Sequence, residues 1–228
     1  MFAATFGALT LVGCVNPEGD LDDFVDRYKN AHATAGTGGT GGEGGAGGST
    51  GCVLPEPDEL SGDSLMAIAQ PALGKNKVIV NLVKISAEKD GDGLKVTFDA
   101  VALAACDQKT PVGEHLPPGS YTVASDGKYD AALGEQTIPG EANSILINTP
   151  VTSSPVLHGQ ICSVRTAENP DATIDFSCGT LTGDLIAPIQ QPLDGTFTIT
   201  RVTDPDNYPE LTTNCAKEAA APPLGGCK

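Results

Sequence analysis

The chain of 228 residues carries 13 basic and 29 acidic side chains, so its formal net charge is −16 at neutral pH. Such an acidic excess excludes the electrostatic footprint of a nucleic-acid-binding protein. The hydrophobic content of 39% excludes a wholly disordered chain. No apolar stretch approaches the roughly 18 residues that a membrane-spanning helix needs.

The first residues have the pattern of an export signal, since residues 2–12 form an uncharged and largely apolar run. A signal-peptide core spans roughly 7–15 residues, too few to cross a bilayer. The run ends in Leu11-Val12-Gly13-Cys14, which resembles the lipobox of bacterial lipoproteins. The resemblance implies that residues 1–13 are cleaved as a signal peptide and that Cys14 is acylated, so membrane lipid becomes a partner. The pattern departs from the family in one respect, because no Lys or Arg precedes Arg27. The alternative is a buried strand whose Cys14 joins a disulfide.

Two segments connect this signal to the body of the chain. Residues 14–32 are predicted to form the lipidated N-terminus and a short helix, with Asp20 as its N-cap. The apolar side chains of that helix recur at helical spacing, at Leu21, Phe24, Val25 and Tyr28. Residues 33–51 are dominated by glycine and predict a flexible tether. No Lys closes the glycine run and no strand precedes it, so it does not resemble a phosphate-binding loop.

Residues 52–228 are predicted to form a disulfide-stabilised β domain. Its expected strands are Asp63–Gln70, Lys77–Ser86, Gly93–Ala104, Ser120–Ser125, Lys128–Leu133, Ile145–Asn148, Pro155–Val164, Thr173–Ala187 and Thr196–Val202. Three hairpins follow from the turn signals between them, one of which turns at Asp126-Gly127. Imperfect alternation in the longest strands indicates that both of their faces are covered in places.

Long hairpins in simple succession favour an all-β fold, an antiparallel up-and-down barrel, over the alternative of a Greek-key β-sandwich. Glycines within the strands, at 159, 179 and 183, are interpreted as bends or bulges where the barrel curves. The Pro-rich residues 203–228 are expected to be irregular and held by cysteines.

Cysteine number adds a constraint on this domain. Seven cysteines minus Cys14 leave an even set that predicts three disulfides in an exported chain: Cys52, Cys106, Cys162, Cys178, Cys215 and Cys227. Cys162 and Cys178 lie on the two arms of one predicted hairpin and are the expected pair. Cys52 and Cys215 bracket the domain and form a second candidate pair. Zinc is disfavoured because no C-x₂-C spacing occurs.

We expect no metal and no cofactor. Two acidic clusters, Asp90-Gly91-Asp92-Gly93 and Asp204-Pro205-Asp206-Asn207, resemble parts of calcium loops. In the first, Leu94 and Lys95 stand where a ligand and a glycine belong. Turn formation explains both clusters without a cation.

No catalytic motif occurs, and the three histidines, His32, His115 and His158, are far apart in the sequence. We therefore expect no catalytic site and no enzyme. A histidine bonded in a cleft to a carboxylate, within reach of a hydroxyl, would challenge this expectation.

The sequence thus favours an exported lipoprotein of the cell envelope, anchored to the outer or the cytoplasmic membrane, whose β domain is a binding or structural module. Its partner beyond the membrane lipid would be a small ligand or a protein, and not a nucleic acid. The alternative is a lipid-anchored hydrolase. A large internal apolar cavity would indicate a ligand carrier, whereas a filled core with an exposed apolar patch would indicate protein binding.

Overall fold

A computed structural model describes residues 52–163 and 175–227. The predicted signal peptide, Cys14, the helix within residues 14–32 and the tether of residues 33–51 lie outside these residues. The described part belongs to one compact unit, Ser49–Lys228. None of its helices is long and apolar enough to cross a membrane.

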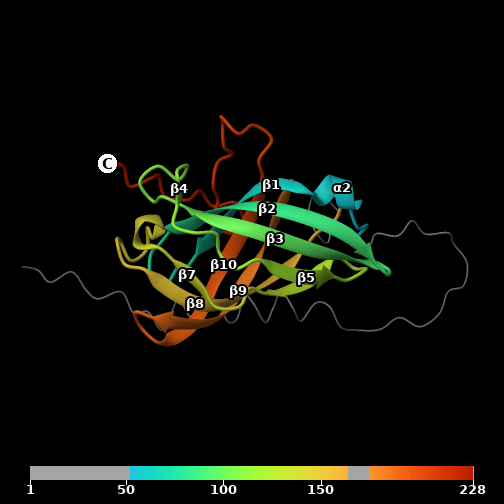
Figure 1. The fold of residues 1–228 in the computed structure, drawn as a ribbon, viewed down its shortest axis with the longest axis horizontal. Helices are drawn as coiled ribbons and strands as arrows, with labels where there is room; N and C mark the ends of the chain where they lie inside the picture. The colour runs from blue at the N-terminus through green and yellow to red at the C-terminus, as the bar shows by residue number, and fades with distance from the viewer. Residues whose placement is uncertain (1–51, 164–174, 228) are drawn as a thin grey trace, which may run out of the picture. The chain divides into compact units, whose positions relative to one another are not determined.

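The domain is nearly all β, as predicted (Figure 1). Its strands are β1 (Gly62–Ala69), β2 (Val78–Asp90), β3 (Gly93–Leu103), β4 (Pro111–Val112), β5 (Gly119–Val123), β6 (Lys128–Ala132), β7 (Gln136–Ile138), β8 (Val151–Gln160), β9 (Phe176–Ala187) and β10 (Gln191–Arg201). A four-residue helix α2 (Pro57–Leu60) precedes β1, and a 3₁₀ turn η1 (Gly140–Ala142) follows β7.

All ten strands form one antiparallel sheet in the order β4-β3-β2-β1-β10-β9-β8-β6, with β5 paired to β3 and β7 paired to β8. Sequential strands are neighbours from β1 to β4 and from β7 to β10, which is the up-and-down order, whereas β5 and β6 pair with β3 and β8. The sheet curls into a half-barrel (Figure 1). Among the described strands no ladder joins β5 to β6, although a tight turn connects them.

Two of the three predicted hairpins are confirmed. Strands β2 and β3 pair from Asn81 and Ala102 to the turn at Gly91 and Asp92, and β8 pairs with β9. The prediction of a hairpin at Asp126-Gly127 is wrong, because its two strands do not pair with each other. The turn forms, since the N–H of Ala124 donates to the carbonyl of Lys128 at 2.9 Å, but the strands then pair with β3 and β8.

The predicted strand at Ile145–Asn148 is also wrong, because these residues form turns. The side-chain oxygen of Asn143 accepts the N–H groups of Ile145 and Leu146 at 2.9 and 2.8 Å. This local Asx turn competes with strand pairing for the same donors. Helix α2 was not expected; Pro57 begins it, and the N–H of Glu56 donates to the Glu59 carboxylate at 2.9 Å.

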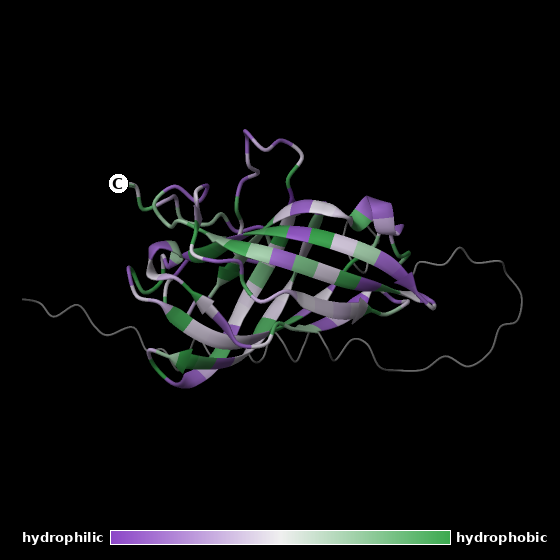
Figure 2. Cartoon of the chain, viewed as in Figure 1, coloured by the Kyte–Doolittle hydropathy of each residue, from purple (hydrophilic) through white to green (hydrophobic). Residues whose placement is uncertain are grey.

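The main core lies on the inner face of the half-barrel. Alternate residues of β3 are buried and exposed, and the same alternation appears as green and purple segments on β2 and β3 in Figure 2. Three aromatic rings of this core are successive neighbours. The ring centroids of Tyr121 and Tyr129 lie 4.8 Å apart, and those of Tyr129 and Phe197 lie 6.4 Å apart. The Tyr121–Tyr129 contact connects β5 and β6 where the ladder is absent.

Glycines on β8 and β9 make room for these rings. A Cβ on Gly159 would lie 2.5 Å from the Tyr129 hydroxyl, and one on Gly179 would lie 1.9 Å from the carbonyl oxygen of His158. The close packing of aromatic rings and backbone, rather than a bulge, therefore requires glycine at these two positions. Gly183 has a φ of +131° and fits the predicted irregularity of the strand.

A second core lies on the outer face of β1 and β2. Leu65, Ala67, Val78 and Val80 are buried there, and Leu211 and other residues of the C-terminal segment pack on them. Both faces of β1 and of the first residues of β2 are thus covered, and for β2 this confirms the interpretation of its imperfect alternation. The C-terminal segment, residues 203–227, is irregular apart from one bridge, Thr212 to Ala219, as predicted.

Candidate functional site

All six cysteines of the domain are paired, which confirms the predicted number of three disulfides. The bonds are Cys52–Cys162, Cys106–Cys227 and Cys178–Cys215. Three disulfides indicate an oxidising, extracytoplasmic environment.

Both predicted pairings, Cys162–Cys178 and Cys52–Cys215, are wrong. The β8–β9 ladder aligns Gly159 with Gly179, so its register, if extended, would place Cys178 opposite Gln160 and not opposite Cys162. Cys178 bonds instead to Cys215 in the C-terminal segment. Cys162 meets Cys52 because the start of the domain runs beside the end of β8, where the N–H of Ser163 donates to the carbonyl of Val53 at 2.7 Å.

The C-terminal segment is fixed to the outer face by side-chain bonds as well as by disulfides. The hydroxyls of Thr196 and Thr198 on β10 donate to the carbonyls of Thr213 and Thr212 at 2.6 and 2.9 Å. Near the end of the segment, the N–H of Leu224 donates to the carbonyl of Ala105 at 2.9 Å. The segment therefore crosses the sheet as a fixed wall.

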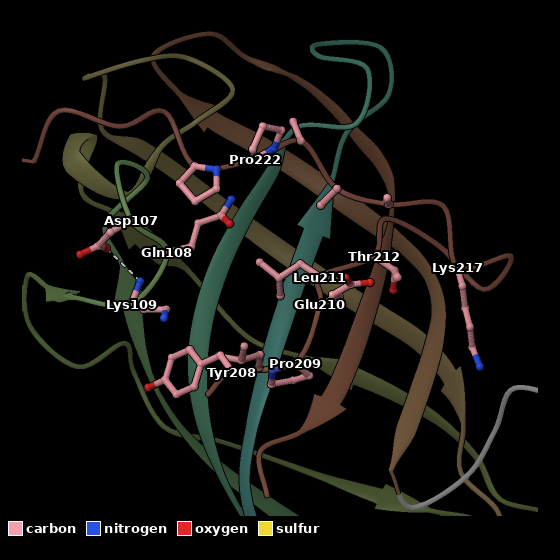
Figure 3. A pocket seen from close by; sticks show the side chains of 15 residues that line it. Asp107, Gln108, Lys109, Tyr208, Pro209, Glu210, Leu211, Thr212, Lys217 and Pro222 are labelled. Atoms are coloured by element: carbon pink, nitrogen blue, oxygen red, sulfur yellow. Dashed lines mark hydrogen bonds between the residues drawn. The ribbon is translucent and has the colours of Figure 1, made fainter. Parts of the chain in front are cut away.

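This wall and the loop after β3 enclose a first groove of about 460 Å³ (Figure 3). Asp107 and Lys109 lie on one side and Leu211 on the other. Leu65 is also part of the lining. Hydrogen bonds from the hydroxyl and N–H of Thr110 lower the pKa of Asp107, so this carboxylate is charged at neutral pH. The groove thus combines apolar surface with charged groups of both signs.

A second groove of about 790 Å³ lies on the other side of the same loop. Two of the large apolar side chains that line it are exposed, Ile147 by 52% and Leu224 by 46%. Glu141 is the acidic residue of its lining, and the Cys106–Cys227 bond contributes to its wall. The two grooves together form a surface around the C-terminal segment that combines apolar contact area with charged side chains.

The interior of the half-barrel is filled by side chains. Within the described residues its two recorded cavities have volumes of about 10 and 40 Å³, which leave no room for a drug-sized ligand. Asn81 is fully buried on the inner face and its side-chain amide has no hydrogen-bond partner.

Histidine 158 lies on the outer face of β8 and contacts side chains from both neighbouring strands. Its Nδ1 lies 2.6 Å from Asp130 Oδ1 on β6, and its Nε2 lies 2.7 Å from Thr182 Oγ1 on β9. The residue is partly exposed and does not face the barrel interior. This is the arrangement of carboxylate, imidazole and hydroxyl that would challenge the absence of a catalytic site, here on an open strand face.

Histidine 115 forms a simpler pair. Its Nδ1 lies 2.7 Å from Asp99 Oδ1, and both side chains are more than half exposed. The sequence did not identify Asp99 and Asp130 as the partners of these two histidines. Both carboxylates follow buried residues in alternating strands, which shows that they point outward, but pairing needs the strand register.

One group of potential metal ligands occurs in the described part of the chain, Cys106, Asp107 and Cys227. Its two sulfurs are bonded to each other and offer no thiolate. The acidic clusters serve as turns: Asp90 and Gly93 pair at the β2–β3 hairpin, and Asp204 Oδ1 accepts the N–H of Asp206 at 3.0 Å.

The chain was compared with known proteins at three levels. No protein family, no curated protein and no solved structure matches it.

Proposed function

We propose that this protein is an exported lipoprotein of the cell envelope, anchored through acylated Cys14, whose β domain binds a partner on its outer surface. The resemblance of Leu11–Cys14 to a lipobox supports the anchor. Stable anchoring takes two lipid signals, which the acyl chains of that family supply. The three disulfides agree with export.

The observation that carries the binding role is the position of the free volume. The interior cavities hold about 10 and 40 Å³, whereas the two grooves beside the C-terminal segment hold about 460 and 790 Å³. Exposed Ile147 and Leu224 supply apolar contact area in the second groove. Apolar surface bordered by charge is typical of protein-binding sites. The partner favoured by these grooves is therefore a protein rather than a large internal ligand.

The anchor is tested by replacing Cys14 with Ser in the full chain and fractionating cells that process lipoproteins. We expect the variant to leave the membrane fraction and remain in the soluble exported fraction, because a serine hydroxyl forms no thioether. Gly19→Ser is the matched control and is expected to stay membrane-bound. Unchanged membrane association of the Cys14→Ser variant would overturn the anchor.

The binding surface is tested by placing a photo-crosslinking side chain at Leu224 and, as the control, at Thr180 on the outer face of β9. We expect a discrete adduct in intact cells from Leu224 alone. Equal adducts at both positions, or none at Leu224, would contradict a partner in the second groove.

A further inference from the structure

We propose that Thr182, His158 and Asp130 form a nucleophilic site that hydrolyses small, activated carboxylic esters. The three side chains form a continuous chain of hydrogen bonds, with 2.6 Å between Asp130 Oδ1 and His158 Nδ1 and 2.7 Å between His158 Nε2 and Thr182 Oγ1. A nucleophile within hydrogen-bond reach of a base, which a third group orients, is the signature of covalent catalysis. This activity goes beyond partner binding and rests on different residues.

The hydrogen bonds fix the direction of proton transfer. A carboxylate only accepts, so the bond to Asp130 places the imidazole proton of neutral His158 on Nδ1. Nε2 is then an acceptor, and the Thr182 hydroxyl donates to it. In this state the hydroxyl proton already points at the base that would remove it.

The strand register keeps this geometry in place. Asp130 on β6 is paired directly with His158 on β8. The β9 partner of His158 is Thr180, and Thr182 is the next residue of β9 on the same outer face. Each is next to an inward residue of the main core, namely Tyr129, Leu157 and Leu181. Rotation of the backbone is therefore restrained by the core, while the polar side chains stay at the surface.

A substrate can reach the site from solvent. Asp130 is 77% and His158 39% exposed, and both line a shallow depression of about 820 Å³ that extends over β5 and β6. Lys128, the outward residue of β6 next to Asp130, also lines the depression and is paired with Asp126 at 3.2 Å.

The reaction consumes only the ester and water. Thr182 Oγ attacks the carbonyl carbon as its proton passes to His158 Nε2, and Asp130 stabilises the imidazolium. The bond to the leaving oxygen breaks and that oxygen takes the proton from His158, leaving an acyl ester on Thr182. Water attacks this ester, gives its proton to His158 and expels Thr182 Oγ, which regains the proton. The products are one carboxylic acid and one alcohol.

The surroundings of Thr182 limit the substrate class. Both neighbours of β9 form ladders at this point, with Thr182 opposite Val156 on β8 and Asp194 on β10. The backbone here therefore offers no pair of unbonded N–H groups as an oxyanion hole, and one such donor contributes about 10²–10³ in rate. Esters with good leaving groups depend least on this help, and the methyl group of threonine favours small acyl groups. Aryl acetates meet both conditions.

The experiment uses the full chain with 4-nitrophenyl acetate and follows both 4-nitrophenolate release and the acetyl adduct by peptide mass spectrometry. We expect acetylation of Thr182, no adduct at this position in Thr182→Ala, and a roughly 100-fold slower adduct formation in His158→Ala, which is in the range for removal of a general base. Thr182→Ser restores the hydroxyl and is expected to restore the adduct. Asp130→Asn is expected to lower the rate because the imidazole loses its orienting carboxylate.

The chain provides two matched controls. Thr180→Ala removes a neighbouring exposed hydroxyl, and His115→Ala removes the histidine of the other His–Asp pair. Both are expected to leave the Thr182 adduct unchanged. An adduct on His158 or on lysine instead of Thr182, or an equal loss in His115→Ala, would overturn the proposal. A loss of the Thr182 adduct that correlates with the urea unfolding midpoints of the variants, and not with the presence of the hydroxyl or the imidazole, would also overturn the proposal.

Discussion

The outer face of the sheet has two different halves. On β1 and β2 its side chains are apolar, and the C-terminal segment covers them; this half, with Leu65 and Val80, is the covered face. On β6, β8 and β9 they are mostly polar and at least partly exposed, and this half, with Asp130, His158 and Thr182, is the open face. Both halves cover the same inner core, so the difference in their outward residues reflects what lies over them.

The two halves differ in how buried and exposed residues alternate along their strands. A strand with one exposed face alternates, whereas a strand covered on both faces becomes continuously apolar. β6 alternates strictly and β1 has four successive buried residues, Ser64–Ala67. The apolar run Leu65–Ala69 is typical of a strand covered on both faces, but no sequence pattern identifies the segment that covers it.

The largest expected effect comes from releasing the segment that makes the covered face. Replacing Cys106 and Cys227 with Ser opens a loop of 121 residues and is expected to cost about 5 kcal/mol of unfolding free energy on the loop-entropy account. The Cys178→Ser, Cys215→Ser pair opens 37 residues and is expected to cost about 4 kcal/mol. Urea unfolding measures both. A loss below about 1 kcal/mol in both variants would contradict a fixed covering segment.

A smaller effect separates the two faces directly. Leu65→Ala removes a side chain that is 1% exposed beneath the segment, and about 3 kcal/mol of unfolding free energy should be lost. Val156→Ala is the matched truncation on the open face, where the side chain is half-buried, and its cost is expected to stay below about 1 kcal/mol. Equal costs at the two positions would remove the distinction between the faces.

The smallest effect appears only at alkaline pH and concerns the core behind the open face. Burial raises the pKa of Tyr129 well above its usual value of 10, and burial together with Tyr129 raises that of Tyr121. A raised folded-state pKa leaves stability intact below pH 10, and stability falls as the pH rises above 10, where the unfolded state loses protons first. Absorbance of tyrosinate and loss of the folded signal are expected to coincide for these residues.

Tyr129→Phe provides the control for this titration. The variant removes one late-titrating phenol and its contact with Ser177 at 3.1 Å, so the alkaline transition should weaken and move upward in pH. Ionisation of Tyr129 in the folded protein near pH 10 would show that the core behind the open face is accessible to water.

The sequence predicted the parts of the fold that depend on local pattern. The β2–β3 hairpin follows from its turn cluster and long alternating arms, and the confirmed up-and-down order follows from the succession of hairpins. The predicted β5–β6 ladder does not form. A two-residue turn fixes only the first hydrogen bond between the two strands, and β5 then pairs with β3 while β6 pairs with β8. That pairing is tertiary and leaves no local signal.

The cysteine pairing and the open-face site depend on distant segments. Cys178 points outward toward residues 203–227, and no periodicity predicts where that irregular segment lies. Asp130, His158 and Thr182 belong to three strands and meet only when the register of all three is known. Sequence analysis found His158 in a strand and could not assign its two partners.

Mass spectrometry of the protein purified from its native membrane tests the central claim most directly, because it reports cleavage, acylation and cysteine pairing together. We expect a chain that begins at Cys14 and carries acyl groups on that residue. We also expect it to contain the bonds Cys52–Cys162, Cys106–Cys227 and Cys178–Cys215. An unmodified Cys14 within an uncleaved chain, or free thiols at the six domain cysteines, would contradict it.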